Sequence, residues 1–265
     1  MLSTISNEAL GALRQALARI EANNGFPDAE AALPIGLPAI DAALGGGLAF
    51  GALHEVIPSA PAHLGAAVGF ALAIATRAVQ QTSAARHALW IETDFAALEG
   101  GKPYGIGLDL FGLPMGRLLI LRVSRPIDAL WAFEEALKSP ALAAVIAELP
   151  EQGATADLSA TRRLSLAART GGGLGLLLRH RKAAWATTAT TRWEIAAAPS
   201  EPDRFGGFGR TAFDLCLNKN RRGRCGRFMV YWDHVARTFI PALSLDLAET
   251  ARDRPGRALR LARAG

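Results

Sequence analysis

Apolar residues follow two alternating patterns along this chain, one typical of buried strands and one typical of helices. Short, almost continuously apolar runs predict strands at residues 52–57, 87–92, 117–123, 142–149 and 174–178. Apolar residues that recur every three or four positions predict helices at residues 3–22, 65–80, 127–138 and 158–170, with a helical turn at 39–44. Because strands and helices alternate, the pattern predicts an α/β fold with a mostly parallel central sheet flanked by helices.

The last part of the chain has a different pattern, which predicts a hairpin. Residues 192–197, 210–218 and 227–233 read as strands, and the last two are separated by a short polar segment. The tip of this predicted hairpin carries four positive side chains: Lys219, Arg221, Arg222 and Arg224. Such a tip can contact a phosphate backbone or an acidic partner, or it can serve to keep an edge hairpin from aggregating.

The predicted N-terminal helix has one narrow apolar stripe, formed by Leu10, Leu13, Leu17 and Ile20. The stripe requires a partner surface, either on the same domain or on another subunit. Residues 23–38 contain several Gly and Pro and are interpreted as a linker. The expected organisation is therefore an N-terminal helix (1–24), an α/β core (25–245) and an Arg-rich tail (246–265) that is mobile and able to become ordered on a partner.

The segment from the first predicted strand to the following helix has the strand–loop–helix order of a phosphate-binding site. Such a loop uses glycine backbone N–H groups to hold phosphates, a Lys for the terminal phosphates and a hydroxyl for magnesium. Here no Lys occurs between Gly51 and Arg77. The degenerate loop includes Pro58, Ser59, His63 and Gly65. The sequence predicts the strand–loop–helix arrangement of a nucleotide site without the residues that bind the nucleotide, and no cofactor is expected.

Two acidic residues follow or end predicted strands, Asp94 and Glu148. A carboxylate at this position can act as a general base or orient a metal. Asp94 is also well placed to cap a helix, and without a Lys in the loop we favour the cap. Glu148 resembles the acid that ends a Walker B strand, which is a weak signal by itself.

Composition narrows the class of protein. Half of the 265 residues are hydrophobic and a fifth are charged, so a large buried core is expected. Cys216 and Cys225 lack the paired spacing of a zinc site, and two cysteines suit a reducing cytoplasm. We expect no metal, no signal peptide and no membrane span, and a cytoplasmic location.

Positive charge is concentrated in the last quarter of the chain. Residues 206–265 carry a net charge of +7, whereas the first 205 residues sum to −2. A second basic cluster, formed by Arg179, Arg181 and Lys182, follows a predicted strand and lies near Trp185 in the sequence. Basic residues beside an aromatic can hold nucleic acid, so both clusters are candidate nucleic-acid or partner sites, with a solvated surface as the alternative.

Taken together, these segments resemble the core of the RecA family. The similarity runs over roughly residues 30–235 and includes LPAIDAALGGGLAFGALHEVIP, LWIETD, AAVIAEL and GLGLLLRH. Two segments, TTRWEIAAAPS and LCLNKNRRGRCGRFMVYWD, are most similar to the ImuA proteins. The resemblance implies a RecA-like fold and a role in damage-induced, error-prone translesion DNA synthesis. It also implies ImuB as a partner, with RecA, the error-prone C-family polymerase or DNA as further ones.

The resemblance also shows what this chain lacks. Asp94 falls where the family keeps a water-activating Glu, and Glu148 at the Walker B acid, but the phosphate-binding Lys and its Thr are absent. Phosphoryl transfer depends on positioned positive charge, so we expect a non-catalytic interaction scaffold rather than an ATPase. The alternatives are an ATP-binding RecA-type recombinase or regulator with a diverged loop, and a SulA-like inhibitor of cell division.

Overall fold

The computed structural model describes residues 2–23, 32–82, 85–149, 156–181, 186–200, 207 and 209–242. Within these residues a nine-stranded sheet runs in the order β11-β10-β9-β8-β3-β7-β6-β4-β5. Its six parallel strands are β3 (Ala52–Pro58), β4 (His87–Thr93), β5 (Leu118–Val123), β6 (Leu142–Leu149), β7 (Leu174–Arg179) and β8 (Thr191–Ala197). The predicted α/β fold with a mostly parallel sheet is confirmed.

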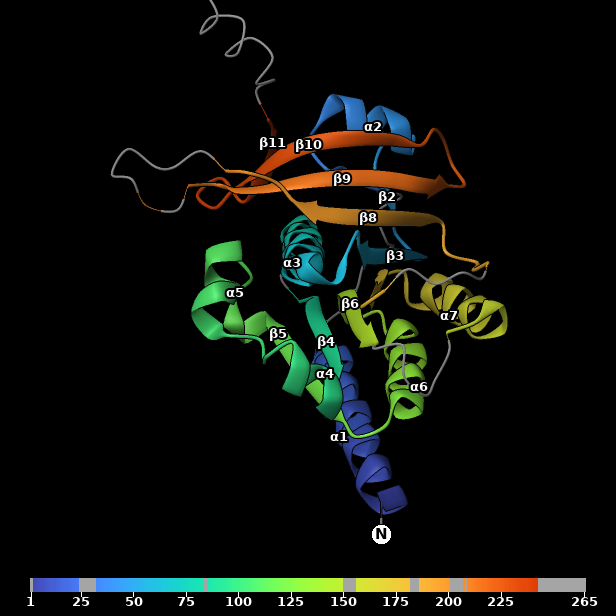
Figure 1. The fold of residues 1–265 in the computed structure, drawn as a ribbon. Helices are drawn as coiled ribbons and strands as arrows, with labels where there is room; N and C mark the ends of the chain where they lie inside the picture. Colours follow the sequence, from blue (N-terminus) through green and yellow to red (C-terminus); the bar gives the residue numbers. More distant parts are fainter. Residues whose placement is uncertain are drawn as a thin grey trace, which may run out of the picture.

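An antiparallel extension continues the sheet beyond β8. It consists of β9 (Thr211–Asn220), β10 (Gly226–Asp233) and β11 (Thr238–Pro241). The predicted hairpin is present as β9 and β10, whereas β11 was not predicted. A separate two-stranded sheet pairs β1 (Ala32–Leu33) with β2 (Leu48–Ala49). Figure 1 shows the antiparallel strands stacked above the parallel part.

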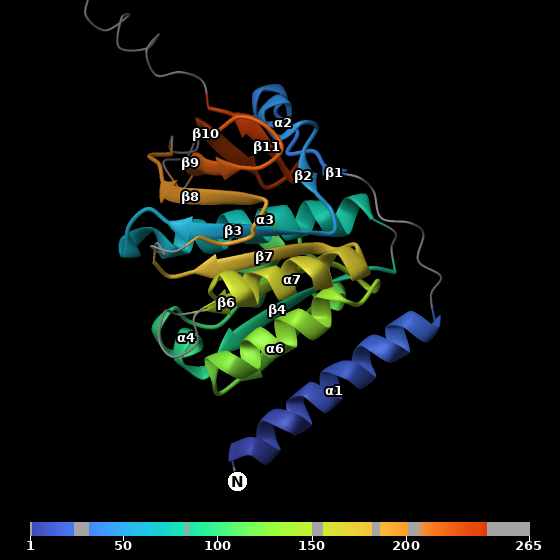
Figure 2. The same ribbon diagram turned by 90° about the vertical axis from the view of Figure 1, so that its right-hand side faces the viewer.

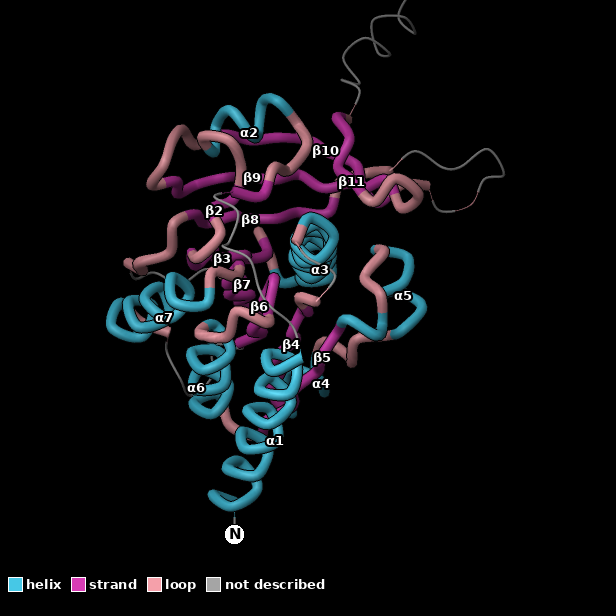
Figure 3. Tube along the Cα trace, turned by 180° about the vertical axis from the view of Figure 1, so that it is seen from behind, coloured by secondary structure: helices cyan, strands magenta, loops and turns pink. Residues whose placement is uncertain are grey.

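Helices cover both faces of the parallel sheet (Figures 1 and 2). On one face lie α3 (Leu64–Gln81) and α5 (Gly105–Phe111), and on the other lie α6 (Pro126–Leu137) and α7 (Leu158–Gly171). Two short helices, α2 (Pro38–Leu44) and α4 (Asp94–Glu99), pack near the sheet ends, and 3-10 turns occur at η1 (Pro61–His63) and η2 (Met115–Arg117). The view from behind shows α1 (Leu2–Asn23) beside α6 (Figure 3).

The central helix α3 is apolar on almost all sides because it is buried on almost all sides. Phe70 lies at its centre, with its ring 5.5 Å from that of Trp193 and 5.8 Å from that of Phe239. Residues Pro61–Gln81 are long and apolar enough to cross a membrane, with a mean hydropathy of 1.5. In this structure, however, they form a core helix against the sheet, where such a pattern is equally expected.

The segment interpreted as a linker is part of the fold where the structure describes it. Ile35 is fully buried, and the carboxylate of Asp41 accepts the backbone N–H groups of Ile35 (2.6 Å) and Gly36 (3.0 Å). Gly47 has a φ of +138°, and a Cβ there would lie 2.3 Å from the carbonyl oxygen of Leu33. Residues 32–38 are therefore an ordered entry to the core rather than a linker.

The N-terminal stripe packs on its own chain. Leu10, Leu13 and Leu17 are buried in the cluster that contains α6, and Ile20 is half-buried. The Nε of Arg14 lies 3.2 Å from Oε1 of Glu135 on α6. Of the two alternatives, the structure favours packing on the same domain. The Arg-rich tail, residues 246–265, lies outside the described residues.

Candidate functional site

The residues singled out from the sequence gather at two opposite edges of the parallel sheet. The carboxyl ends of β3, β4, β6 and β7 bring the degenerate loop, Asp94, Glu148 and Arg179 to one edge. The hairpin tip lies at the other edge, because Asn220 at the end of β9 pairs with Thr191 at the start of β8. The end of β7 and the hairpin tip thus lie at different edges, although Arg179 and Lys219 both contact the Glu55–Thr187 pair between them.

The degenerate loop has few backbone N–H groups available to bind a phosphate. Pro58 and Pro61 have no N–H group. The N–H of Ser59 donates to the carbonyl of Ile195 at 2.8 Å. The N–H groups of His63 and Leu64 donate to carbonyls within the η1 turn. Most residues of the 58–64 loop are therefore unable to hold an anion in the way that a phosphate-binding loop does.

His63 does not replace the missing Lys in this arrangement. Its Nδ1 accepts the backbone N–H of Ala197 at 3.1 Å. A ring nitrogen that accepts this hydrogen bond cannot at the same time donate one to a phosphate. The contact instead ties the start of α3 to the end of β8, which is a structural role.

The two acids have different surroundings. Glu148 is 4% exposed, and its Oε1 lies 2.8 Å from Nε2 of His180. Asp94 is exposed, and the prediction that it caps a helix was wrong by one residue: Thr93 caps α4 by accepting the N–H of Ala96 at 3.1 Å. Among the described residues, no group of three or more His, Cys, Asp or Glu is arranged to hold a metal ion.

A cavity of about 540 Å³ lies between α3 and α5, beside the degenerate loop. Its walls are mostly apolar and include Leu64, Val68, Leu72, Leu108 and Phe111. Lys102 and Glu148 are the charged residues among those that line it. One lysine, with the carboxylate of Glu148 in the same cavity, is a poor counterpart for a triphosphate, whose several charges require several cations or N–H donors.

Arg179, a predicted contact residue, is buried in an ion pair. Glu55, in the middle of β3, is fully buried, and its carboxylate receives the Nε of Arg179 (3.1 Å) and the Nε of Arg192 (2.7 Å). The hydroxyl of Thr187 donates to the same carboxylate at 2.9 Å. Arg179 is 5% exposed, so we leave it out of the proposed binding surface. Arg181 is exposed, and Lys182 lies outside the described residues.

The hairpin tip is fixed by contacts with the end of α2. The carbonyl of Ala43 accepts the N–H of Arg224 (3.1 Å) and the side-chain amide of Asn220 (2.8 Å). The N–H of Arg221 donates to the carbonyl of Thr190 at 2.9 Å. The tip is therefore held against the body of the domain, with Arg221, Arg222 and Arg224 exposed.

Gly223→Ala is expected to displace this tip. A Cβ at residue 223 would lie 2.1 Å from the carbonyl oxygen of Ala43, so the backbone must shift and the hydrogen bonds to Ala43 lengthen. We expect a loss of about 2 kcal/mol in the free energy of unfolding, as for other overpacked sites. Urea denaturation measures it, with Gly107→Ala as the control because a Cβ there meets nothing within 4 Å. Equal stabilities of the two variants would contradict the described docking.

Lys219 points inward rather than into solvent. Its Nζ donates to the carbonyl of Thr187 at 2.6 Å. Burial, and then the positive charge of Arg221, lower the pKa of Lys219 below its ordinary value. Lys219 thus acts as a support of the 186–190 segment, and the accessible charge of the hairpin comes from its three arginines.

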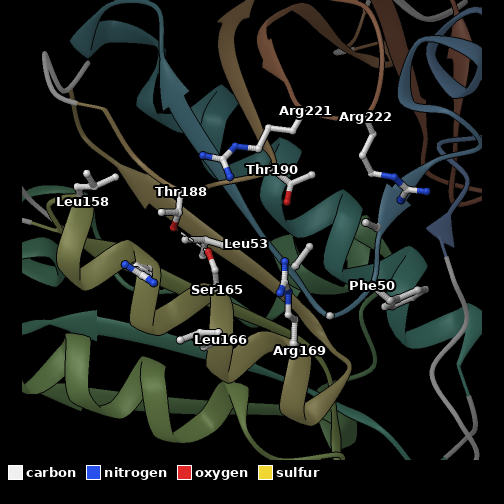
Figure 4. A pocket seen from close by; sticks show the side chains of 14 residues that line it. Phe50, Leu53, Leu158, Ser165, Leu166, Arg169, Thr188, Thr190, Arg221 and Arg222 are labelled. Carbon is white, nitrogen blue, oxygen red and sulfur yellow. Dashed lines mark hydrogen bonds between the residues drawn. The ribbon is translucent and has the colours of Figure 1, made fainter.

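A groove of about 900 Å³ lies between the hairpin tip and α7 (Figure 4). One wall is a face of α7 with Leu158, Arg162, Ser165, Leu166 and Arg169, and the other carries Arg221 and Arg222. The floor comes from residues 49–53 and from Thr188 and Thr190. The hydroxyls of Ser165 and Thr188 lie 2.9 Å apart and join floor to wall.

The sequence predicted the helix that carries Arg162 and Arg169, but nothing in it connected that helix to the hairpin. The connection depends on the sheet order, which puts β8 beside β3 and β9 beside β8, while α7 packs against β3. No pattern within either segment shows this proximity. Both segments are positively charged, and this shared charge is the feature of the sequence that could have suggested that they form one site.

Comparison with known proteins agrees with this architecture. No protein-family model matches the chain. The chain is 29% identical over 212 residues to Protein ImuA from two strains of Caulobacter vibrioides, which covers 75% of this chain and 82% of each relative. The crystal structure of the RadB recombinase superposes with a TM-score of 0.52 at 15% identity, over 80% of this chain and all of RadB. The resemblance inferred from the sequence is confirmed: the chain is similar to ImuA, and its fold is that of the RecA-like recombinases.

Proposed function

We propose that this chain is a non-hydrolytic accessory protein of error-prone translesion DNA synthesis, in which a RecA-like core serves as a scaffold for protein partners. The similarity to ImuA supports the pathway. The observation that supports the non-hydrolytic role is the loop between β3 and α3. This loop lacks the phosphate-binding Lys, and the N–H groups of Ser59 and His63 donate to carbonyls of the protein itself. The protein acts in the cytoplasm, during the response to DNA damage.

The expected direct partner is ImuB, with RecA and the error-prone C-family polymerase as further members of the complex. A scaffold needs rigid, exposed surfaces that are separate from its core. The hairpin tip and the exposed face of α7 meet this requirement, because hydrogen bonds fix both to the body of the domain. Binding of DNA by the hairpin arginines stays a prediction.

The test combines co-purification with a mutagenesis assay. The tagged chain is expected to retain ImuB of the same organism through gel filtration, and its gene to restore damage-induced mutation in a deletion strain. Glu148→Gln, which keeps a hydrogen-bond acceptor for His180, is expected to restore mutation as well as the unchanged gene does. A folded Glu148→Gln protein that binds ImuB but restores no mutation would indicate catalysis and overturn the proposal.

A further inference from the structure

The groove between α7 and the hairpin carries positive charge on both walls. Arg162 and Arg169 contribute from α7, and Arg221 and Arg222 from the hairpin tip. None of the described residues that line the groove is acidic. A concave surface lined by one sign of charge concentrates its field, so the groove attracts a negatively charged occupant.

The same groove is also apolar. Leu158 and Leu166 are 54% and 55% exposed, so about half of the surface of each leucine is open to solvent. They occupy one face of α7 with the two arginines, because residues 158, 162, 165, 166 and 169 follow the helical repeat. Exposed leucines framed by charged residues are typical of a protein-binding surface.

We propose that this groove binds an acidic peptide segment that carries apolar anchor residues, contributed by a protein partner of the complex. Carboxylates of the segment pair with the arginines, and its apolar side chains cover Leu158 and Leu166. The inference rests on the proposed scaffold function and assigns it a surface. It also extends the basic site from the hairpin to α7, where Arg162 and Arg169 become binding residues.

Nucleic acid satisfies the charge of the groove but not its apolar wall. Single strands bind basic grooves by stacking their bases on exposed aromatic rings. Among the residues that the structure describes, the aromatic one that lines this groove is Phe50, which is 9% exposed and packs in the core. The exposed apolar atoms come from leucines, which suit aliphatic or aromatic side chains of a peptide.

The dimensions agree with a short segment. From residue 158 to residue 169 the wall of α7 is about 16 Å long, given a rise of about 1.5 Å per residue. That length holds about three turns of a helix or about five residues of an extended strand. The volume of about 900 Å³ is sufficient for a few large side chains rather than for a whole domain surface.

The experiment is fluorescence anisotropy of the full-length protein with a labelled synthetic peptide of 15 residues. The peptide has Leu at helical spacing and Glu or Asp elsewhere; the comparison probes are a peptide of Glu alone and a single-stranded oligonucleotide. We expect the amphipathic peptide to bind at least about tenfold more tightly than the Glu peptide. Absence of binding by the amphipathic peptide, or tighter binding of the oligonucleotide within the same groove, would overturn the proposal.

Two neighbouring arginines supply matched variants. Arg162 lines the groove, whereas Arg163 points away and its Nε lies 3.2 Å from Glu134 on α6. Arg162→Gln is expected to weaken binding of the peptide about tenfold, and Arg163→Gln is expected to weaken it by less than about twofold. Leu166→Ser is expected to weaken it by a similar factor, with Leu98→Ser, an 84% exposed residue elsewhere, as control. Equal effects of groove and control variants would contradict the site.

The same variants separate this proposal from the proposed function. If Arg162→Gln and Leu166→Ser abolish binding of both the peptide and ImuB, the groove is the surface that the scaffold uses for ImuB. If they lose the peptide but keep ImuB, the groove still binds an acidic segment, of a different partner. If the unchanged protein binds the peptide but never ImuB, the scaffold assignment fails while the groove stands.

Discussion

Replacing Glu55 with alanine is expected to lower the free energy of unfolding by about 3–5 kcal/mol, the cost of removing one partner from a buried charge network. The carboxylate is fully buried and joins Arg179, Arg192 and Thr187. Without it, two guanidinium groups lose the buried carboxylate that they share. The Nη2 of Arg179 keeps its bond to the carbonyl of Ala156 (2.6 Å), which neutralises no charge.

Urea denaturation measures the loss, and Glu135→Ala is the matched control. Glu135 also pairs with an arginine, but at the surface, where the side chain of Arg14 is 61% exposed. Such pairs contribute about 0–1 kcal/mol. If Glu55→Ala cost no more than Glu135→Ala, the network would not hold β3, β7 and β8 together as described. The segment 186–190 also depends on Glu55 through Thr187, so the variant is expected to loosen the groove floor.

Acidification from pH 6.5 to pH 4 is expected to destabilise the protein by about 3 kcal/mol through His54 alone. Burial, the largest cause, lowers the pKa of this histidine from 6.5 to about 4. The unfolded chain therefore binds a proton in this range and the folded chain does not, so stability is fully present above pH 6.5. It falls as the pH is lowered, and the loss is complete below about pH 4.

The hydrogen bonds of His54 explain why its neutral form is required. Its Nε2 lies 3.0 Å from the carbonyl oxygen of Ala49, which can only accept, so Nε2 carries the proton. Its Nδ1 lies 2.8 Å from the hydroxyl of Thr191, which in turn accepts the indole N–H of Trp193 at 3.1 Å. The hydroxyl proton thus points at Nδ1, and a second ring proton would break this chain of hydrogen bonds.

Stability curves from pH 4 to pH 8 test this for the unchanged protein and for His54→Gln. The glutamine amide can donate to Ala49 but does not titrate in this range. The difference between the two curves is expected to grow as the pH rises from 4 to 6.5 and then to stay constant. Parallel curves over the whole range would show that His54 is protonated equally in both states.

Much of the fold follows from apolar periodicity, because the buried strands and the amphipathic helices each match one burial pattern. What periodicity missed depends on tertiary contacts. The strand β11 has only four residues and is defined by its pairing with β10. The Gly-rich segment of α5 forms a helix because Leu108 and Leu113 are buried in the core of the domain. The entry at 32–38 is ordered by the carboxylate of Asp41.

The candidate site was predictable in its parts but not in its assembly. The hairpin and its arginines followed from strand alternation and turn composition. The burial of Arg179 had a signal that was overlooked: Glu55 follows His54 in a strand that is apolar elsewhere, and a buried carboxylate needs cationic partners. The wall of α7 had no such signal, because its proximity to the hairpin is set by sheet order.

We propose that this chain retains a RecA-like core without nucleotide chemistry. Calorimetric titration of the full-length protein with ATP and magnesium at low salt tests it most directly. We expect no heat of binding at millimolar nucleotide, because the loop has no Lys and the N–H groups of Ser59, His63 and Leu64 donate to protein carbonyls. Saturable binding would contradict it and would make Asp94 and Glu148 the next residues to change.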